Sequence, residues 1–449
     1  MVTAEDLSSA LKIYKKVATA SFLEATLRSA GVAEERASIF NAAIVVWLMI
    51  FQRLNPDHSL AAAIQYLKAV DVSEIVDVKR ESIKVRHGRI SDNTGGYAQG
   101  RERVPVSVVE QVTDALNKEL SKSEGRRRIY SVDGTTILVS CSEDNVGEYS
   151  QHRTRLGTSH YPLIRVELAT DAITGVASKP FIGAHNGPEA SSEITLVQEV
   201  LGELERGSVV LADKLYGVTQ VIHRADELGL KLIVRLRDGV AAKLIGKSKE
   251  ASGSVNVMWR PSDYEKKRYA HLAGVKITGR CVWRTIQRKG FKPFKLFLFT
   301  TCDDSAEKVV DLYGLRWNIE HDFRDLKSTL DMNFISAKSP AMIKKEIFTG
   351  IAAYNLIRHF MKVVAGQLKT SVRNIGFKLS LRKFRALGDV FLSGAGDAQL
   401  NRSLFIVLRD FRTLKISTRK TPRPSTPRQK WRKGVQRYRK SVPFAKMVN

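Results

Sequence analysis

Hydrophobic residues between Leu312 and Leu330 recur at the spacing of one helix face. On a helix that turns about 100° per residue, they fall within an arc of about 80°. The residues of this stripe are Leu312, Leu315, Ile319, Phe323, Leu326 and Leu330. The pattern predicts a continuous helix that packs the stripe against a core.

Polar and ionisable residues border this stripe. Within an adjacent arc of about 60°, along about 20 Å of helix axis, lie Tyr313, Arg316, Glu320 and Lys327. A carboxylate held on a helix between two cations and a phenol suits a site for a metal ion and a phosphate chain. The alternative is a solvated face with i, i+4 ion pairs, such as Arg316 with Glu320.

The pattern changes from helix to strand after residue 128. The run IYSVDGTTILV predicts a strand that carries Asp133, with a turn or bulge at Asp133-Gly134 near its end. The runs LIRVELATD and GVASKPFIG predict a hairpin that turns between Asp171 and Gly175. Together these runs predict three antiparallel strands.

Strands and helices then alternate. The continuously apolar run SVVLADKLYG predicts a buried strand that ends at Asp213, between helices over 191–206 and 217–228. KLIVRLR predicts the next strand. This order predicts an α/β fold with a mixed sheet, in which the first and fourth strands are neighbours, so that the two aspartates could meet.

Regions outside this alternation differ in composition. Residues 1–120 and 365–410 are mostly helical in pattern, and β-type runs over about 240–301 predict a β-rich insertion within 121–364. Residues 411–449 hold thirteen Lys and Arg and no Asp or Glu. Such a tail cannot bury a core, which predicts a disordered basic segment.

The net charge narrows the choice of partner. The 449 residues include 73 Lys and Arg against 46 Asp and Glu, a formal charge of +27. This excess favours a polyanion, with nucleic acid ahead of an anionic membrane surface. No apolar run reaches the length of a membrane-spanning helix, and no secretory signal is visible. Three cysteines without metal-ligand spacing favour a cytoplasmic location.

The four residues that border the stripe also carry the spacing Y-x2-R-x3-E-x6-K. With the flanking text RWNIEHDFRDLKSTLDMN, this spacing resembles the signature of the DDE transposases of the insertion-sequence-four family. The text VDGTT around Asp133 and LADKLYG around Asp213 resembles the family's first and second aspartate motifs. The resemblance covers about residues 78–364.

The resemblance implies an RNase H-like catalytic core, a mixed sheet with flanking helices interrupted by the β-rich insertion. Asp133, Asp213 and Glu320 would be its catalytic and metal-binding carboxylates. Hard carboxylate oxygens suit Mg2+, or Mn2+ in its place. Two such ions can activate an attacking oxygen and stabilise a leaving one in phosphodiester cleavage.

The resemblance also implies contacts with DNA. Tyr313, Arg316 and Lys327 would hold the terminal nucleotides, and the helical region 1–120 would bind the element's end. Arg235 and Arg237 occupy alternate positions of VRLR, which predicts that they point to the same side and reach a phosphate.

Further basic and aromatic residues have two interpretations each. Trp259 and Trp283 either stack on a flipped base or pack in the core. Phosphate contacts or a solvated surface are both open for the basic residues Lys79, Arg80, Lys84, Arg86, Arg89, Arg101 and Arg103.

The expected function is cut-and-paste DNA transposition by a homodimer in a synaptic complex. Three alternatives stay open. A simple RNase H-like nuclease would cleave without joining, and an inactive relic would only bind DNA. A tyrosine recombinase would use Tyr313 as a covalent nucleophile, but it needs an Arg and His set that the sequence does not assemble.

Overall fold

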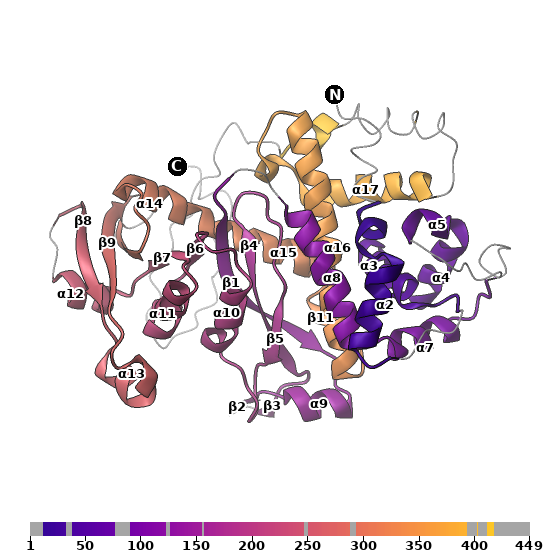
Figure 1. Cartoon of the computed structure of the whole chain (residues 1–449), viewed down its shortest axis with the longest axis horizontal. Helices are drawn as coiled ribbons and strands as arrows, with labels where there is room; N and C mark the ends of the chain where they lie inside the picture. Colours follow the sequence, from indigo (N-terminus) through magenta and orange to yellow (C-terminus); the bar gives the residue numbers. More distant parts are fainter. Residues whose placement is uncertain are drawn as a thin grey trace, which may run out of the picture.

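A mixed sheet forms the centre of the molecule in the computed structural model. The structure describes residues 12–32, 38–76, 90–122, 126–154, 157–246, 250–287, 293–392, 402 and 411–416. Strands β8 and β9 lie at one end of the molecule, and the N-terminal helices and α17 lie at the other (Figure 1). No helix among the described residues combines the length and apolar character needed to cross a bilayer.

The main sheet has nine strands in the part of the chain that the structure describes. They are β1 (Ile129–Val139), β4 (Leu163–Asp171), β5 (Phe181–Ala184), β6 (Val209–Ala212), β7 (Lys231–Arg235), β8 (Ser252–Trp259), β9 (Ile277–Ile286), β10 (Phe294–Thr300) and β11 (Phe334–Ile335). Their order is β5-β4-β1-β6-β7-β10-β9-β8, with β11 paired to β1. A separate short pair joins β2 (Arg153–Thr154) to β3 (Gly157–Thr158).

Strand directions confirm the predicted α/β class with a mixed sheet. Strands β1, β4 and β5 are antiparallel neighbours, and the β4–β5 connection turns at Gly175, whose φ of +82° favours glycine. Strand β6 pairs in parallel with β1, and β7 with β6. The first and fourth predicted strands are therefore neighbours, as expected.

The prediction that Asp133 lies near a strand end is wrong. Strand β1 continues through Gly134 to Val139 and stays paired with β4 as far as Leu138. The β-branched run after Gly134 favours a strand, and this glycine remains in it because the neighbouring side chains leave no room for a Cβ.

Strands β8, β9 and β10 occupy the region predicted to be β-rich, 240–301. They continue the main sheet, since β10 pairs antiparallel with β7, β9 with β10, and β8 with β9. Two short helices accompany them, α12 (Asp238–Ile245) and α13 (Asp263–Arg268). This part of the sheet forms the end of the molecule that lies farthest from the N-terminal helices (Figure 1).

Helices cover both faces of the central strands. Helices α10 (Glu193–Gly202) and α11 (Thr219–Glu227) share one apolar cluster with Val132 of β1 and Val210 of β6. On the other face, Ile137 of β1 belongs to a cluster with α8 (Val106–Ser121) and α16 (Pro340–Gln367). Alternate residues of β1 therefore face different helix layers.

The N-terminal helices belong to the same apolar cluster as α16. They are α2 (Ala20–Ser29), α3 (Ala42–Leu54), α4 (Leu60–Ala69), α5 (Val72–Ile75) and α7 (Gly95–Arg103), and α17 (Phe377–Leu392) packs beside them. Asn41 caps α3 by accepting the Ile44 N–H, and Ser59 caps α4 likewise. Helix α3 is buried on nearly all sides, as its sequence AAIVVWLMIFQRL requires.

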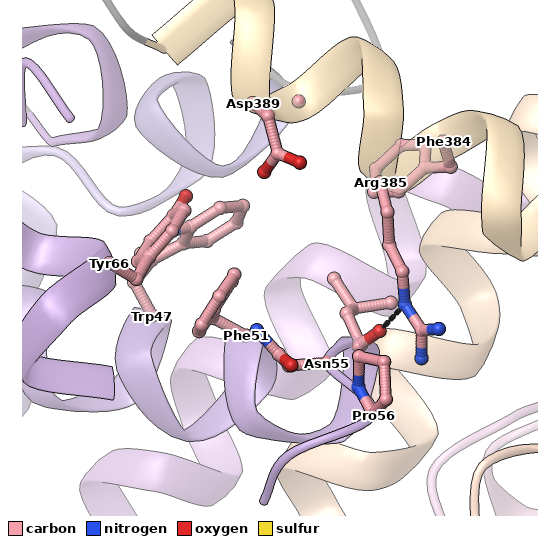
Figure 2. A pocket seen from close by; sticks show the side chains of 10 residues that line it. Trp47, Phe51, Asn55, Pro56, Tyr66, Phe384, Arg385 and Asp389 are labelled. Carbon is pink, nitrogen blue, oxygen red and sulfur yellow. Dashed lines mark hydrogen bonds between the residues drawn. The ribbon is translucent and has the colours of Figure 1, made fainter. Parts of the chain in front are cut away.

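A cavity of about 340 Å³ separates α3 and α4 from α17. Figure 2 shows Trp47, Phe51 and Tyr66 along one side of it, with Asp389 pointing in from α17. Arg385 donates a hydrogen bond to the Leu54 carbonyl at its edge. The cavity belongs to the helical packing, and neither predicted aspartate lines it.

The chain is helical without a break from 306 to 329, but the helix predicted across 313–330 is not α-helical throughout. Helix α14 (Ala306–Gly314) is followed by a 3-10 turn (Leu315–Trp317), helix α15 (Asn318–Arg324) and a π-helical turn (Asp325–Thr329). The stripe is nevertheless buried, apart from the half-buried Leu315. The backbone hydrogen bonds can change from i, i+4 to i, i+3 or i, i+5 while the same helix face stays on the core. The spacing of apolar residues in the sequence does not reveal such a change.

The predicted basic tail begins with a packed segment. Residues 411–414 form a 3-10 turn, Leu414 is fully buried, and Lys415 bridges to Ile375. The remainder of that tail, 417–449, lies outside the described residues, as do the predicted phosphate contacts from Lys79 to Arg89.

Candidate active site

Asp133 and Asp213 lie level with each other on neighbouring strands. Ser131 of β1 pairs with Leu211 of β6, so two residues further along each chain the aspartates stand side by side where β6 ends. The Asp213 carboxylate accepts a hydrogen bond from the Leu215 backbone N–H at 2.6 Å, which fixes its side chain in a turn.

The surroundings of Asp133 disfavour its charge. Burial raises the pKa of Asp133 to about 6; Arg316 opposes this rise, and the neighbouring carboxylate of Asp213 adds to it. A carboxyl group with a pKa of about 6 beside a second carboxylate suits a site that takes up a cation.

Arg316 connects the strand aspartate to the helix glutamate. Its Nη1 lies 3.7 Å from Asp133 Oδ2, and its Nη2 lies 3.3 Å from Glu320 Oε1. The Arg316 side chain is only 8% exposed, whereas that of Glu320 is 49% exposed. Arg316 Nε has no hydrogen-bond partner among the described residues. The predicted i, i+4 pair exists, but its cation is buried rather than solvated.

Tyr313 and Arg235 border the same carboxylates. Burial raises the pKa of Tyr313, and the charge of Asp213 adds to this rise. The positive charges of Arg316 and Arg235 lower the pKa of Tyr313 and so oppose the rise. The Tyr313 hydroxyl therefore lies within the electrostatic influence of Arg316, Arg235 and Asp213. A buried phenol with a raised pKa is a poor nucleophile, which argues against the tyrosine recombinase alternative.

Lys327 and Arg237 have different surroundings. Lys327 lines a small cavity with Thr135 and Phe323, where burial lowers its pKa. Arg237 is exposed at the start of α12, because β7 already ends at Arg235. The backbone nevertheless stays extended through Arg237, and Leu236 between the two arginines is buried, so the predicted alternation along VRLR continues to Arg237.

The donor set fits a divalent cation in part. Asp133 and Asp213 provide hard carboxylate oxygens of the kind that Mg2+ or Mn2+ prefers. Glu320 instead pairs with Arg316. Within the described ranges, no three or more His, Cys, Asp or Glu side chains are placed to hold one metal ion. The structure thus brings together two of the three predicted ligands.

A buried carboxyl group behind Asp133 was not predicted. Glu167 of β4 is fully buried, and its Oε1 accepts a 2.6 Å hydrogen bond from the Tyr216 hydroxyl. Burial raises the pKa of Glu167 to about 9, against the effect of this hydrogen bond. The sequence does hold a signal, a lone glutamate in the apolar run LIRVELATD.

A buried ionic network behind Glu320 was also missed. Asp322 is fully buried and accepts 2.6 Å hydrogen bonds from Arg358 of α16 and from Arg373. Arg358 also bonds Asp325 at 3.0 Å, at the start of the π-helical turn. The network ties α15 to α16 and so fixes the segment that carries Glu320. The sequence pattern could not predict this network, because its acidic and basic residues are far apart in the chain.

The aromatic candidates of the β-rich region are core residues. Trp259 is 5% exposed and donates to Thr219 at 3.0 Å, and Trp283 is 8% exposed. Both therefore support the packing interpretation. Trp317, in contrast, is 51% exposed and stacks on the Arg316 guanidinium at 4.8 Å. It lies next to the signature arginine, and the sequence analysis overlooked it.

Arg101 and Arg103 are engaged within the protein. Arg101 pairs with Glu346 of α16 at 2.6 Å, and Arg53 pairs with the same carboxylate at 2.5 Å. Arg103 donates to the Phe40 carbonyl at 2.8 Å. Arg101 is therefore held on the helical core, where it shares one carboxylate with Arg53, and is not a solvated surface residue.

Comparison with known proteins identifies the family. Residues 124–356 match the family model described as "Transposase DDE domain". Transposase InsG for insertion sequence element IS4, from Escherichia coli strain K12, is 24% identical over 253 residues, 54% of each chain. The chain belongs to the DDE transposases of the insertion-sequence-four family. The resemblance inferred from the signature spacing is confirmed.

Other transposases also match this chain. The transposase for insertion sequence element IS421 of Escherichia coli is 47% identical over 53 residues, 12% of this chain and 14% of that protein. The chain matches about half the length or less of these curated relatives. A piggyBac transposase synaptic complex with hairpin DNA, solved by cryo-EM, aligns over 95% of this chain and 87% of that one, with 11% identity and a TM-score of 0.43.

Proposed function

We propose that this chain is a DNA transposase that cuts the ends of its insertion sequence and joins them to target DNA. The observation that carries the proposal is the meeting of Asp133 and Asp213 on neighbouring strands, beside the Arg316 and Glu320 of the family signature. Membership of the DDE transposase family supports the same reaction class.

The strand arrangement supports an RNase H-like core. In the order β5-β4-β1-β6-β7, the first three strands are antiparallel and the last two run parallel to β1. This arrangement places the C-terminal end of β6 beside the middle of β1, where both aspartates lie. Strands β8–β10 would then be the family's insertion between the second aspartate and the glutamate.

Asp133 and Asp213 would hold the divalent cation in this proposal, with Glu320 as the third carboxylate. Such ions activate the attacking oxygen and stabilise the leaving oxygen of a phosphodiester. The attacking groups would be water in cleavage and the freed 3′-hydroxyl in joining. No covalent bond to the protein is needed, in agreement with the buried position of Tyr313.

Arg316 has a particular part in this mechanism. Its guanidinium bridges Asp133 and Glu320 in the free protein. A DNA phosphate offers the same bidentate acceptor geometry as a carboxylate. We expect Arg316 to bind the phosphate beside the scissile bond, which releases the exposed Glu320 side chain toward the aspartates. Arg235 and Tyr313 lie close enough to contact the same strand.

DNA would approach across Trp317 and the exposed side of α15. The net charge of +27 favours this association through counterion release. Since both element ends must be cut and joined together, a homodimer on paired ends is the expected assembly.

The test is Mg2+-dependent cleavage and joining of a duplex that carries the end of the element encoding this chain. Glu320→Gln should abolish both products while DNA binding is kept, and the exposed Glu307→Gln on α14 should act like the wild type. Cleavage without joining would identify a nuclease, and binding without cleavage would identify a relic. Equal activity of Glu320→Gln and wild type would remove Glu320 from the mechanism.

A further inference from the structure

A hydrogen-bonded pair lies behind the two aspartates, on the opposite face of β1. The Asp133 side chain faces α15, as its contact with Arg316 shows. The next residue, Gly134, faces α10, where a Cβ would meet the side chains of Glu167 and Glu193. Alternation along the strand therefore puts Glu167 and Tyr216 directly behind the site.

The pair crosses β1 at Gly134. Strand β1 lies between β4, which carries Glu167, and β6, which leads into Tyr216. A bond between these side chains must therefore pass over β1. A Cβ on Gly134 would overlap Glu167 Oε2, so the crossing is at the residue next to Asp133. Only glycine leaves room there.

Tyr216 is also fixed to Asp213 through the chain. It ends the turn that starts at Asp213, and its backbone N–H bonds the Asp213 carbonyl at 3.3 Å. Tyr216 is thus three residues from Asp213 in the chain. Glu167, which accepts its hydrogen bond, packs against Gly134, the residue next to Asp133. A change at this bond alters the position of one aspartate relative to the other.

We propose that the Tyr216–Glu167 hydrogen bond sets the spacing of Asp133 and Asp213, which makes Tyr216 and Glu167 positioning residues for the divalent cation. This inference rests on the proposed function. Neither residue touches the cation or DNA in it, since both are fully buried behind β1.

The chemistry of Glu167 supports a role beyond packing. Its Oε2 is buried and has no hydrogen-bond partner in the described part of the chain. Burying such an oxygen opposes folding, and an apolar residue of similar size would avoid this cost. The buried Glu167 carboxyl group, despite this cost, provides the acceptor that orients the Tyr216 hydroxyl.

Tyr216→Phe removes the hydrogen bond and keeps the ring. Tyr97→Phe is the matched control, because Tyr97 is also fully buried and donates to Gln52 at 2.7 Å, among the N-terminal helices. The readout is Mn2+ affinity of the full chain without DNA, measured by electron paramagnetic resonance. Outer-shell changes of this kind weaken metal binding about 10- to 100-fold. We expect a loss of that order in Tyr216→Phe and none in Tyr97→Phe.

Substitutions at Glu167 test the same bond from its other end. Glu167→Gln keeps an oxygen acceptor and should retain most of the Mn2+ affinity, whereas Glu167→Met should lose it as Tyr216→Phe does. Thermal melts confirm that each variant is folded. Equal loss in Glu167→Gln and Glu167→Met would overturn the inference, as would unchanged affinity in Tyr216→Phe.

The two proposals fail differently. If the wild type binds Mn2+ and Asp133→Asn abolishes it while Tyr216→Phe does not weaken it, only the positioning role is wrong. If wild type and Asp133→Asn bind Mn2+ equally, the cation site itself is wrong, and the positioning role is overturned with it.

Discussion

Arg316 lies 3.7 Å from Asp133, so a cation of the helical signature neutralises a carboxylate of the central strand. The same guanidinium contacts Glu320 at 3.3 Å. The free protein therefore balances the acidic site with an internal cation. DNA phosphates and divalent cations have to compete with this arrangement when the site is loaded.

Replacing Arg316 should change how cation binding depends on pH. Arg316 lowers the pKa of Asp133, so Arg316→Ala should raise that pKa above its present value of about 6. Protons then compete with Mn2+ up to a higher pH, and the acidic loss of affinity should begin earlier as pH falls. At pH 8 the affinity should rise, because a repulsive charge is gone. Mn2+ titrations between pH 5 and 8 measure both effects.

The exposed Arg324 on the same helix provides the control. Arg324→Ala should leave the pH profile of Mn2+ binding unchanged. If both variants shift the profile equally, the effect is one of net charge and not of the Arg316 contact.

Glu167 should make the protein less stable as pH rises. Its pKa is raised from 4.5 to about 9 in the folded state, so folding favours the protonated form. The stability it contributes is complete below about pH 4.5 and is lost as pH rises toward about 9. Glu167→Gln should flatten this slope. Urea unfolding at pH 5, 7 and 9 measures it.

Other charged and titratable groups influence the pKa of Glu167, and they have to be considered in that experiment. They are Tyr216, Glu193, Asp133 and Arg165. Asp133 has a raised pKa as well, so part of the slope between about pH 4 and 6 should persist in Glu167→Gln. A slope above pH 7 identical to that of the wild type would contradict the assignment.

The buried network at Asp322 should be essential for stability. Asp322→Ala leaves Arg358 without its nearest carboxylate in an almost fully buried position. Breaking a buried ion pair at one partner costs about 3–5 kcal/mol of unfolding free energy. Removing the exposed Lys118–Asp114 pair by Lys118→Met should cost less than about 1 kcal/mol. Urea unfolding midpoints compare the two.

Gly134→Ala should destabilise the sheet. The added Cβ overlaps the Glu167 carboxyl, and overpacking of this kind costs about 1–3 kcal/mol. The double variant Gly134→Ala, Glu167→Ala removes the overlap and should cost less than the sum of its single changes. Additive losses in a double-mutant cycle would show that the two residues do not touch.

Trp317 should contribute to binding of the element's end. Its half-exposed ring lies on the Arg316 guanidinium, where an unpaired base could stack. Loss of one such stack costs about 1–3 kcal/mol of binding free energy. Trp317→Ala should therefore weaken binding of a duplex with a frayed end, measured by fluorescence anisotropy. Trp317→Phe should weaken it less, and the exposed Tyr264→Ala should have no effect.

Much of the central sheet could be predicted from the sequence. Alternating apolar and polar runs, together with the apolar run before Asp213, predicted the strands. The order of antiparallel strands followed by strand–helix alternation predicted that β1 and β6 are neighbours, as they are. The meeting of Asp133 with Asp213 followed from that order. The buried stripe of 312–330 was also correct, since it depends only on which residues are apolar.

The errors share a physical cause. Gly134 was interpreted as a turn residue, which put Asp133 near a strand end. The glycine is instead needed because the Glu167 side chain of a neighbouring strand passes close to it, and the strand continues. The signature helix changes its turn type where Arg358 of α16 bonds Asp325. Each depends on contacts between distant segments, which local pattern does not contain.

Helix α3 has a consequence for synthesis of the chain. Its apolar surface is buried largely by helices that include α16, whose first residue is Pro340. At about 5–20 residues per second, α16 emerges roughly 15–60 s after α3 has left the ribosome. During that time a helix of composition AAIVVWLMIF lacks its final partner. A chain truncated before α16 keeps part of this apolar surface uncovered and should therefore aggregate.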